Sequence, residues 1–245
     1  MDGDGSIQVN HWRYKNLQYR LVIKLKYCDE NLKMLNLIEK YIGGNVRIIG
    51  LAKPDKFVIW VVNDKKQINN IINIFNSYPP ITSRLKAQLA FMLECFSKND
   101  VEWYLNERNN KYNKFNLTRL SQTCARVPDY NIDPAKLAKL GFSNNIETYF
   151  NEWLSGFIEA EGCFSIRNTS KNHSFSIGQN NDKYILELIK THFFIKNNIR
   201  LINNKFWFIE VYNKSILINI INHCLKFPLL GEKTISFYKF RDLFK

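Results

Sequence analysis

The chain has 245 residues and a formal net charge of +13 at pH 7, with a pI of about 9.5. This length is enough for two domains of about 100 residues, each with its own core. The positive charge favours a polyanionic partner such as a nucleic acid. Scattered cysteines, without a C-x-x-C pair or a Cys/His cluster, argue against zinc and a disulfide framework. No apolar run approaches transmembrane length, so we expect no membrane partner.

The chain opens with a polar turn that leads into two strands. The opening run is Asp2-Gly3-Asp4-Gly5-Ser6-Ile7, and a D-G-D-G run suits a turn or a calcium loop. Residues 17–26 then alternate, with Tyr19, Leu21, Ile23 and Leu25 on the apolar face. The polar face carries Gln18, Arg20, Lys24 and Lys26. Such a face can lie along phosphates and offer Arg, Lys and Gln to base edges in a major groove.

The order of elements repeats at a spacing near 150 residues. A helical pattern begins at Asp29 and another at Asp182, which is a spacing of 153 residues (182 − 29). Val46-Arg47-Ile48 matches Ile199-Arg200-Leu201, and Tyr78-Pro79 matches Phe227-Pro228. Each copy reads motif, strand, strand, helix, strand, strand, helix, Pro, helix. Two copies in this order predict an α+β duplication rather than a solenoid.

A polar stretch separates the two copies. It contains the breakers Val127-Pro128-Asp129 and Ile132-Asp133-Pro134, which are typical of a linker with short helical pieces. We therefore predict a first repeat over residues 1–105, a linker over 106–145 and a second repeat over 146–245.

The most informative segment opens the second repeat and runs from Trp153 to Ile166. Small residues at Gly156 and Ala160 lie one helical turn apart, so two such helix faces can approach backbone to backbone. Glu161 falls where the helix ends, and a strand pattern with Phe164 and Ile166 on one side follows at once. A carboxylate at the tip of a tightly packed helix is a plausible metal ligand.

These residues resemble the signature of the LAGLIDADG homing endonucleases, in the variant W-L-x-G-F-I-E-A-E-G-x-F. The opening run from Asp2 resembles the second half of the same motif, with Asp4 where Glu161 falls and Gly3 where Ala160 falls. The motif helix that would precede Asp2 is absent from the sequence. The resemblance implies a duplicated αββαββα fold with two pseudo-symmetric halves and saddle-shaped antiparallel sheets. It also implies a monomer that cuts both strands of DNA across the minor groove.

The resemblance also implies roles for individual residues. Metal ligands would be the carboxylates of Asp4 and Glu161 and the carbonyls of Gly3 and Ala160, with Mg²⁺ as the metal. Gln179 would position a water and Lys233 would supply a basic group. The corresponding first-half positions hold Lys26 and Arg84, and a protonated lysine cannot accept a hydrogen bond from water. The residues expected to contact DNA are Gln18, Arg20, Lys24, Lys26, Arg47, Arg167, His173, Gln179 and Arg200.

Two alternative functions fit the same sequence. A group I intron RNA maturase would use this fold to bind folded RNA without nuclease chemistry. A basic DNA-binding module would leave the motif acids as spectators. Abundant Asn, Ile, Lys and Phe all have A/T-rich codons, which suggests an organellar gene, in a mitochondrion or a chloroplast.

Overall fold

A computed structural model describes residues 1–50, 55–113, 146–166 and 172–244. The chain divides into two compact units, Met1–Arg119 and Leu120–Lys245, and each is described by itself. The predicted linker over 106–145 lies mostly outside the described residues, so its extent stays a prediction. No helix among the described residues is long and apolar enough to span a bilayer.

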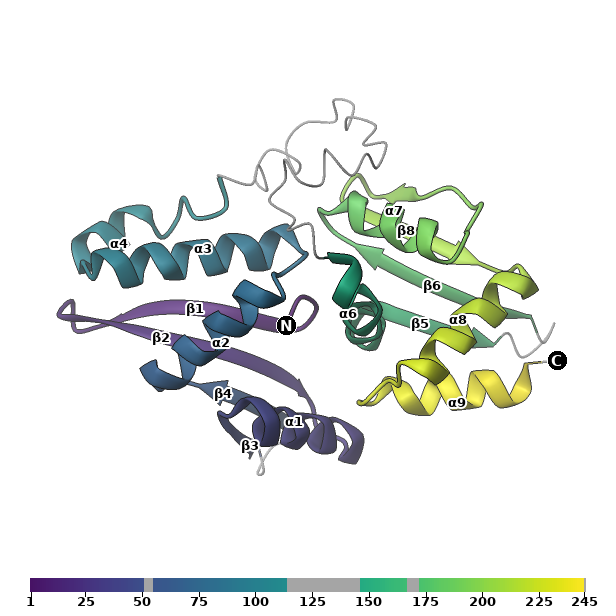
Figure 1. Cartoon of the computed structure of the whole chain (residues 1–245), viewed down its shortest axis with the longest axis horizontal. Coiled ribbons are helices and arrows are strands. Elements are labelled where there is room, and N and C mark those ends of the chain that lie inside the picture. Colours follow the sequence, from purple (N-terminus) through teal and green to yellow (C-terminus); the bar gives the residue numbers. More distant parts are fainter. Residues whose placement is uncertain (51–54, 114–145, 167–171, 245) are drawn as a thin grey trace. The chain divides into compact units, whose positions relative to one another are not determined.

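The first unit is one four-stranded antiparallel sheet with helices packed along it (Figure 1). The strand order is β1-β2-β4-β3, so β2 and β4 are the inner strands and β1 and β3 form the edges. The elements are β1 (Gly5–Trp12), β2 (Asn16–Lys26), α1 (Asp29–Ile42), β3 (Asn45–Ile49), β4 (Phe57–Val62), α2 (Lys65–Ser77), α3 (Ser83–Lys98) and α4 (Val101–Glu107).

The second unit repeats this topology, with strand order β5-β6-β8-β7. Its elements are α6 (Ile146–Glu161), β5 (Gly162–Ile166), β6 (His173–Gln179), α7 (Lys183–His192), β7 (Arg200–Ile202), β8 (Phe206–Val211), α8 (Lys214–Lys226) and α9 (Lys233–Leu243). The predicted α+β duplication with two antiparallel sheets is confirmed.

Alternation along the strands builds each core. In β2 the side chains of Tyr19, Leu21 and Ile23 are buried, as the sequence pattern predicts. They join Trp60 of β4 and Leu85 of α3 in one apolar cluster. Full burial of one large apolar side chain stabilises a fold by about 1.5–3 kcal/mol. The apolar residues of each strand therefore determine which face of the sheet points into the core.

A buried polar link fastens the motif helix α6 to α8 in the second unit. The Ser155 hydroxyl donates to the Phe227 carbonyl over 2.7 Å and lies 3.2 Å from Nε2 of His223. Burial lowers the pKa of His223 to about 4, with a smaller contribution from the neighbouring His192. The His223 ring is therefore neutral at neutral pH, when it packs among aromatic rings.

The sheet register corrects the sequence alignment of the two repeats by one residue. Gly5 pairs with Ile23 and Gly162 pairs with Ile177, so Ile23 and Ile177 are equivalent. This spacing is 154 residues (177 − 23), and it makes Gln179 equivalent to Leu25. The expected equivalence of Gln179 and Lys26 is therefore wrong; Lys26 matches Asn180. The match between Arg47 and Arg200 is confirmed, because Arg47 pairs with Ile59 and Arg200 with Phe208.

Candidate functional site

Each unit carries an acid directly before a glycine that begins its sheet. Asp4 is exposed in the turn before β1, and Glu161 is the half-buried last residue of α6 before β5. A Cβ on Gly5 would lie 2.7 Å from the Met1 carbonyl oxygen, and one on Gly162 would lie 2.7 Å from the Ile158 carbonyl oxygen. Only glycine allows such close backbone approach, so both acids are followed by the same kind of tight turn.

A second pair of acids, two residues earlier, is structural. Asp2 is buried, and its carboxylate accepts the backbone N–H groups of Ile81 (3.1 Å) and Thr82 (2.9 Å) before α3. Glu159 likewise accepts the N–H groups of Gly231 (3.0 Å) and Lys233 (2.9 Å) at the start of α9. Sequence reasoning missed this role, although the acid-x-acid spacing shared by the two motifs was a signal for it.

The helix α6 buries one side within its own unit and leaves the small-residue side open. Leu154, Phe157 and Ile158 are buried, whereas Gly156 is exposed. A Cβ on Gly156 would meet no heavy atom within 4 Å in the described part of the chain. The predicted backbone-to-backbone approach of a helix to Gly156 and Ala160 stays a prediction.

The two basic residues expected near the motifs differ in their contacts. The Arg84 guanidinium, at the start of α3, donates to the carbonyls of Asp2, Gly3 and Gly5 over 2.7–2.8 Å. The side-chain ammonium of Lys233, at the start of α9, makes no hydrogen bond to any residue that the structure describes. Arg84 is thus bound to the motif turn, including the carbonyl of Gly3 that was expected to hold a metal.

The polar side chains of the first sheet line one face, as predicted. Gln18, Lys24 and Lys26 are exposed and Arg20 is half-buried. The Lys24 ammonium lies 4.1 Å from the centroid of the Phe57 ring, which supports its position over the sheet. Arg47 of β3 is also exposed. Their placement on this face is confirmed, while their contact with DNA stays a prediction.

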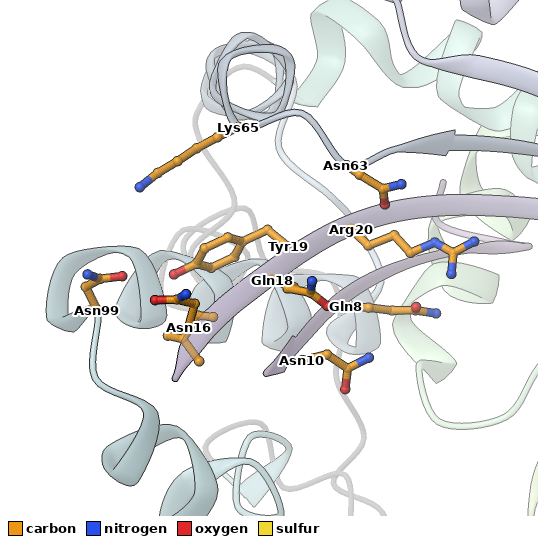
Figure 2. Close-up of a pocket in the computed structure, with 10 residues that line it drawn as sticks. Gln8, Asn10, Asn16, Gln18, Tyr19, Arg20, Asn63, Lys65 and Asn99 are labelled. Carbon is orange, nitrogen blue, oxygen red and sulfur yellow. The ribbon is translucent and has the colours of Figure 1, made fainter. Parts of the chain in front are cut away.

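An amide-lined cavity of about 590 Å³ lies where β2 extends beyond β4 (Figure 2). Gln8 pairs with Arg20 and Asn10 with Gln18, so their side chains share the polar face. The lining residues are Gln8, Asn10, Asn16, Leu17, Gln18, Tyr19, Arg20, Asn63, Lys65 and Asn99. Sequence reasoning missed the contribution of β1, although Ser6-Ile7-Gln8-Val9-Asn10 alternates in the same way.

The second sheet presents a different polar face from the one expected. Phe164 pairs with Phe175 and Ile166 with His173, so His173 lies on the apolar face. Its ring packs edge-on against Phe240 (4.9 Å) and Phe244 (5.2 Å). Gln179 shares this parity, and its Oε1 accepts the N–H of Asn180 over 3.0 Å. His173 and Gln179 were both expected to contact DNA, but they lie on the same strand face as the buried Phe175 and Ile177.

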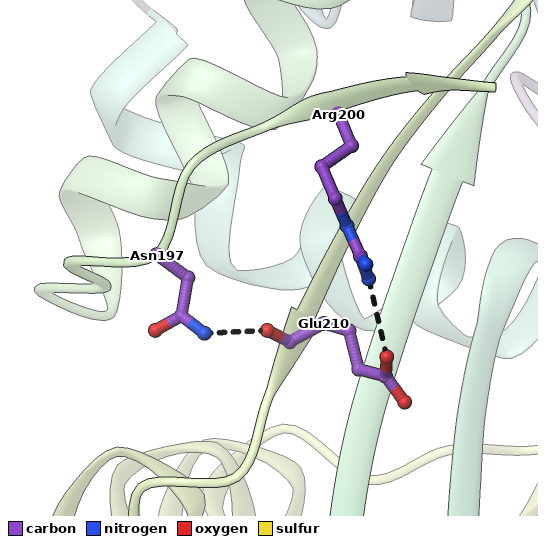
Figure 3. A network of polar contacts seen from close by, with 3 residues as sticks. All are labelled: Asn197, Arg200 and Glu210. Carbon is purple, nitrogen blue, oxygen red and sulfur yellow. Dashed lines mark hydrogen bonds and ion pairs between the residues drawn. The ribbon is translucent and has the colours of Figure 1, made fainter.

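The opposite face of the second sheet is lined by small polar residues and one ion pair. Ser176 pairs with both Cys163 and Glu210 across the sheet. The Arg200 guanidinium donates to the Glu210 carboxylate over 3.2 Å, and Asn197 donates to the Glu210 backbone carbonyl over 2.8 Å (Figure 3). Arg200 is exposed, as expected for a DNA contact, but its charge is partly neutralised. Arg167 lies outside the described residues.

Comparison with known proteins identifies the family to which this fold, with its paired acids, belongs. The sequence matches the LAGLIDADG endonuclease family over residues 1–95 and 154–244, and the chain belongs to this family.

Individual relatives refine the comparison. The chain is 45% identical over its whole length to the probable intron-encoded endonuclease aI3 of Dictyostelium citrinum, of which it covers 92%. It is 42% identical to the aI3 protein of Debaryomyces hansenii, but spans only 36% of that protein. I-SmaMI bound to an uncleaved DNA target with calcium ions has a similar fold, with a TM-score of 0.67, 18% identity, and coverage of 98% of this chain and 86% of that one. I-CpaMI bound to uncleaved DNA gives a TM-score of 0.65 at 17% identity, with 98% and 87% coverage.

Proposed function

We propose that this protein is a homing endonuclease that cuts both strands of a specific DNA duplex with the help of Mg²⁺. The observation that carries the proposal is the repeated motif end: an acid, a tightly packed glycine and the first strand of a sheet, in each unit. Family membership and relatives named as intron-encoded endonucleases support the same activity.

The donor chemistry of the motif residues fits a hard divalent cation. Asp4 and Glu161 offer carboxylate oxygens, and Gly3 and Ala160 offer backbone carbonyls. No cluster of three or more His, Cys, Asp or Glu side chains exists among the described residues. Mg²⁺ commonly takes one or two carboxylates and completes its shell with water and substrate phosphates. When bound, such a metal activates water and neutralises charge on the scissile phosphate.

Lys233 and Gln179 complete the proposed chemistry in the second unit. The Lys233 ammonium makes no hydrogen bond to the described residues, so it is available to a phosphate oxygen, where its charge stabilises the developing negative charge. The Gln179 amide can orient an attacking water, because it both donates and accepts hydrogen bonds. Lys26 would supply only positive charge in the first unit, since it has no acceptor when protonated.

The first sheet provides the main proposed DNA contact. Lys24, Lys26 and Arg47 are exposed cations that would neutralise phosphates. The amides of Gln8, Asn10 and Gln18 and the guanidinium of Arg20 would contact base edges, where amides pair well with adenine and arginine with guanine. On the second sheet only Arg200, held by Glu210, offers a described cation on the polar face. The first sheet is therefore expected to supply more phosphate contacts than the described second sheet.

The gene is proposed to lie in an organellar intron, most simply a mitochondrial one, and the protein to act as a monomer with two active halves. The abundance of Asn, Ile, Lys and Phe, whose codons are A/T-rich, supports the organellar origin. A protein called uncharacterized mitochondrial protein RF1, from Saccharomyces cerevisiae, is 26% identical to the chain over 83% of its length, which agrees with this origin.

The test is cleavage of a DNA duplex that joins the two flanking exons without the intron, with and without Mg²⁺. A parallel assay measures binding to the intron RNA. We expect a double-strand break that requires Mg²⁺ and disappears in Glu161→Gln. Tight binding to the intron RNA with no cleavage of the junction duplex would replace the nuclease by the maturase alternative.

A further inference from the structure

Arg84 holds the first motif turn through three backbone carbonyls. Its Nη1 donates to the Gly5 carbonyl over 2.7 Å, and its Nη2 donates to the carbonyls of Asp2 and Gly3 over 2.8 Å each. These acceptors flank Asp4 on both sides. Hydrogen bonds from a charged donor are stronger than those between neutral groups, so the three together fix the backbone that carries the Asp4 carboxylate.

The contact is reciprocal. While Arg84 of α3 binds the backbone of the motif turn, the Asp2 side chain of that turn binds the backbone N–H groups of Ile81 and Thr82 at the start of α3. Each segment therefore supplies a side chain that forms hydrogen bonds with backbone groups of the other segment. The turn is tightened further by the Gly5 N–H, which donates to the Met1 carbonyl over 3.0 Å.

The second unit has no equivalent contact among its described residues. Glu159 repeats the role of Asp2, since it accepts the N–H groups of Gly231 and Lys233. The Lys233 side chain does not repeat the role of Arg84, because Lys233 forms hydrogen bonds with the described residues only through its backbone. The three bonds of Arg84 leave from two separate guanidinium nitrogens, whereas a lysine ammonium carries all its N–H groups on one nitrogen and would reach fewer of these carbonyls.

We propose that Arg84 is a positioning residue for Asp4 and does not contact the scissile phosphate. Its effect on cleavage rests on the proposed nuclease function, whereas its effect on the motif turn does not. The basic positions of the two units thus have different tasks: Lys233 provides charge to the substrate, and Arg84 provides a fixed backbone for the first acid. One strand of the target is then cut by a half that lacks a free cation at this position.

The experiment compares Arg84→Lys, Arg84→Ala and the control Lys66→Ala, which removes an exposed cation of α2. Amide hydrogen exchange is measured without DNA or metal, and cleavage of each end-labelled strand is measured with Mg²⁺. We expect both Arg84 variants to speed exchange at the Gly5 amide about tenfold or more, because the charged hydrogen bonds that hold the turn are lost or reduced. Both variants should also slow cleavage of one strand and accumulate nicked duplex, while Lys66→Ala matches the wild type in both assays.

Lys233→Ala separates positioning from charge. It should slow cleavage of the other strand without changing exchange at Gly5. Unchanged exchange in both Arg84 variants, or wild-type cleavage by Arg84→Lys, would overturn the proposal. If the wild-type protein cuts no duplex, the exchange measurement still decides whether Arg84 fixes the turn, so failure of the nuclease function is distinguishable. Arg84→Lys keeps the charge and most of the side-chain volume, which guards against simple unfolding of Arg84→Ala.

Discussion

Replacing Asp2 tests whether the two acids of the first motif have separate tasks. Asp2→Ala removes the acceptor of three donors: the N–H groups of Ile81 and Thr82 and the Thr82 hydroxyl. Each hydrogen bond to a charged group contributes about 1.5–3 kcal/mol, but the bonds share one side chain and water can reach part of the gap. We therefore expect a loss of about 3–4 kcal/mol in the free energy of unfolding of the first unit.

The assay is thermal melting followed by circular dichroism, with urea unfolding as a second measure. One kcal/mol shifts the melting temperature of a domain of about 100 residues by about 4–8 °C, so the loss corresponds to a fall of about 12–30 °C. Asp2→Asn keeps one oxygen acceptor and should lose about half as much. Asp4→Asn is the matched control: Asp4 is exposed, so its melting temperature should stay within about 2 °C of the wild type. A fall below about 3 °C for Asp2→Ala would refute the assignment of Asp2 to the start of α3.

Three further predictions follow from the site and the core. Asp4→Asn and Glu161→Gln should lower double-strand cutting by at least about 100-fold, while the dissociation constant for DNA changes little. Plasmid cleavage measures the cutting and gel shifts measure the DNA binding. Cutting at the wild-type rate would show that these acids are not catalytic. Lys24→Ala should reduce the slope of log K against log salt by about one, and an unchanged slope with unchanged site preference would place Lys24 outside the interface. Because burial lowers the pKa of His223 to about 4, the unfolded chain binds more protons between about pH 6.5 and 4, so the second unit should lose stability as the pH falls through that window. His223→Gln should flatten this pH dependence, and an equally steep curve in the variant would assign it to other groups.

The sequence predicts the duplicated topology because apolar periodicity and the order of turns are local properties of the chain. The polar and apolar faces of β2, and the end of α6 at Glu161, follow directly from such patterns. The equivalence of Gln179 and Lys26 did not follow, because the distance from the motif glycine to its paired isoleucine differs between the repeats: 18 residues from Gly5 to Ile23 (23 − 5) and 15 from Gly162 to Ile177 (177 − 162). An alignment slip of one residue is small along the chain, but it turns a strand side chain to the other face of its sheet.

The contacts of Asp2 and Arg84 could not be read from the sequence for a different reason. Each joins residues about 80 positions apart, and nothing in the local pattern says which carboxylate or guanidinium will meet which backbone group. Arg84 looked like a catalytic cation because its neighbours match those of Lys233. Only the folded geometry shows that the Arg84 side chain is held by backbone carbonyls. Lys233, by contrast, forms hydrogen bonds with the described residues through its backbone alone.

The motif turn and α3 are joined in both directions by hydrogen bonds from a side chain of one segment to the backbone of the other. These paired contacts limit how segments of related proteins can be recombined. A hybrid that takes its motif from one relative and its third helix from another would combine an acid with a helix start that it was not selected to fit. Asp2, Arg84 and residues 81–82 therefore have to be inherited together, although they lie far apart in the gene. Exchange points within the β-strands between them would separate these residues, whereas exchange of a whole unit would keep them together.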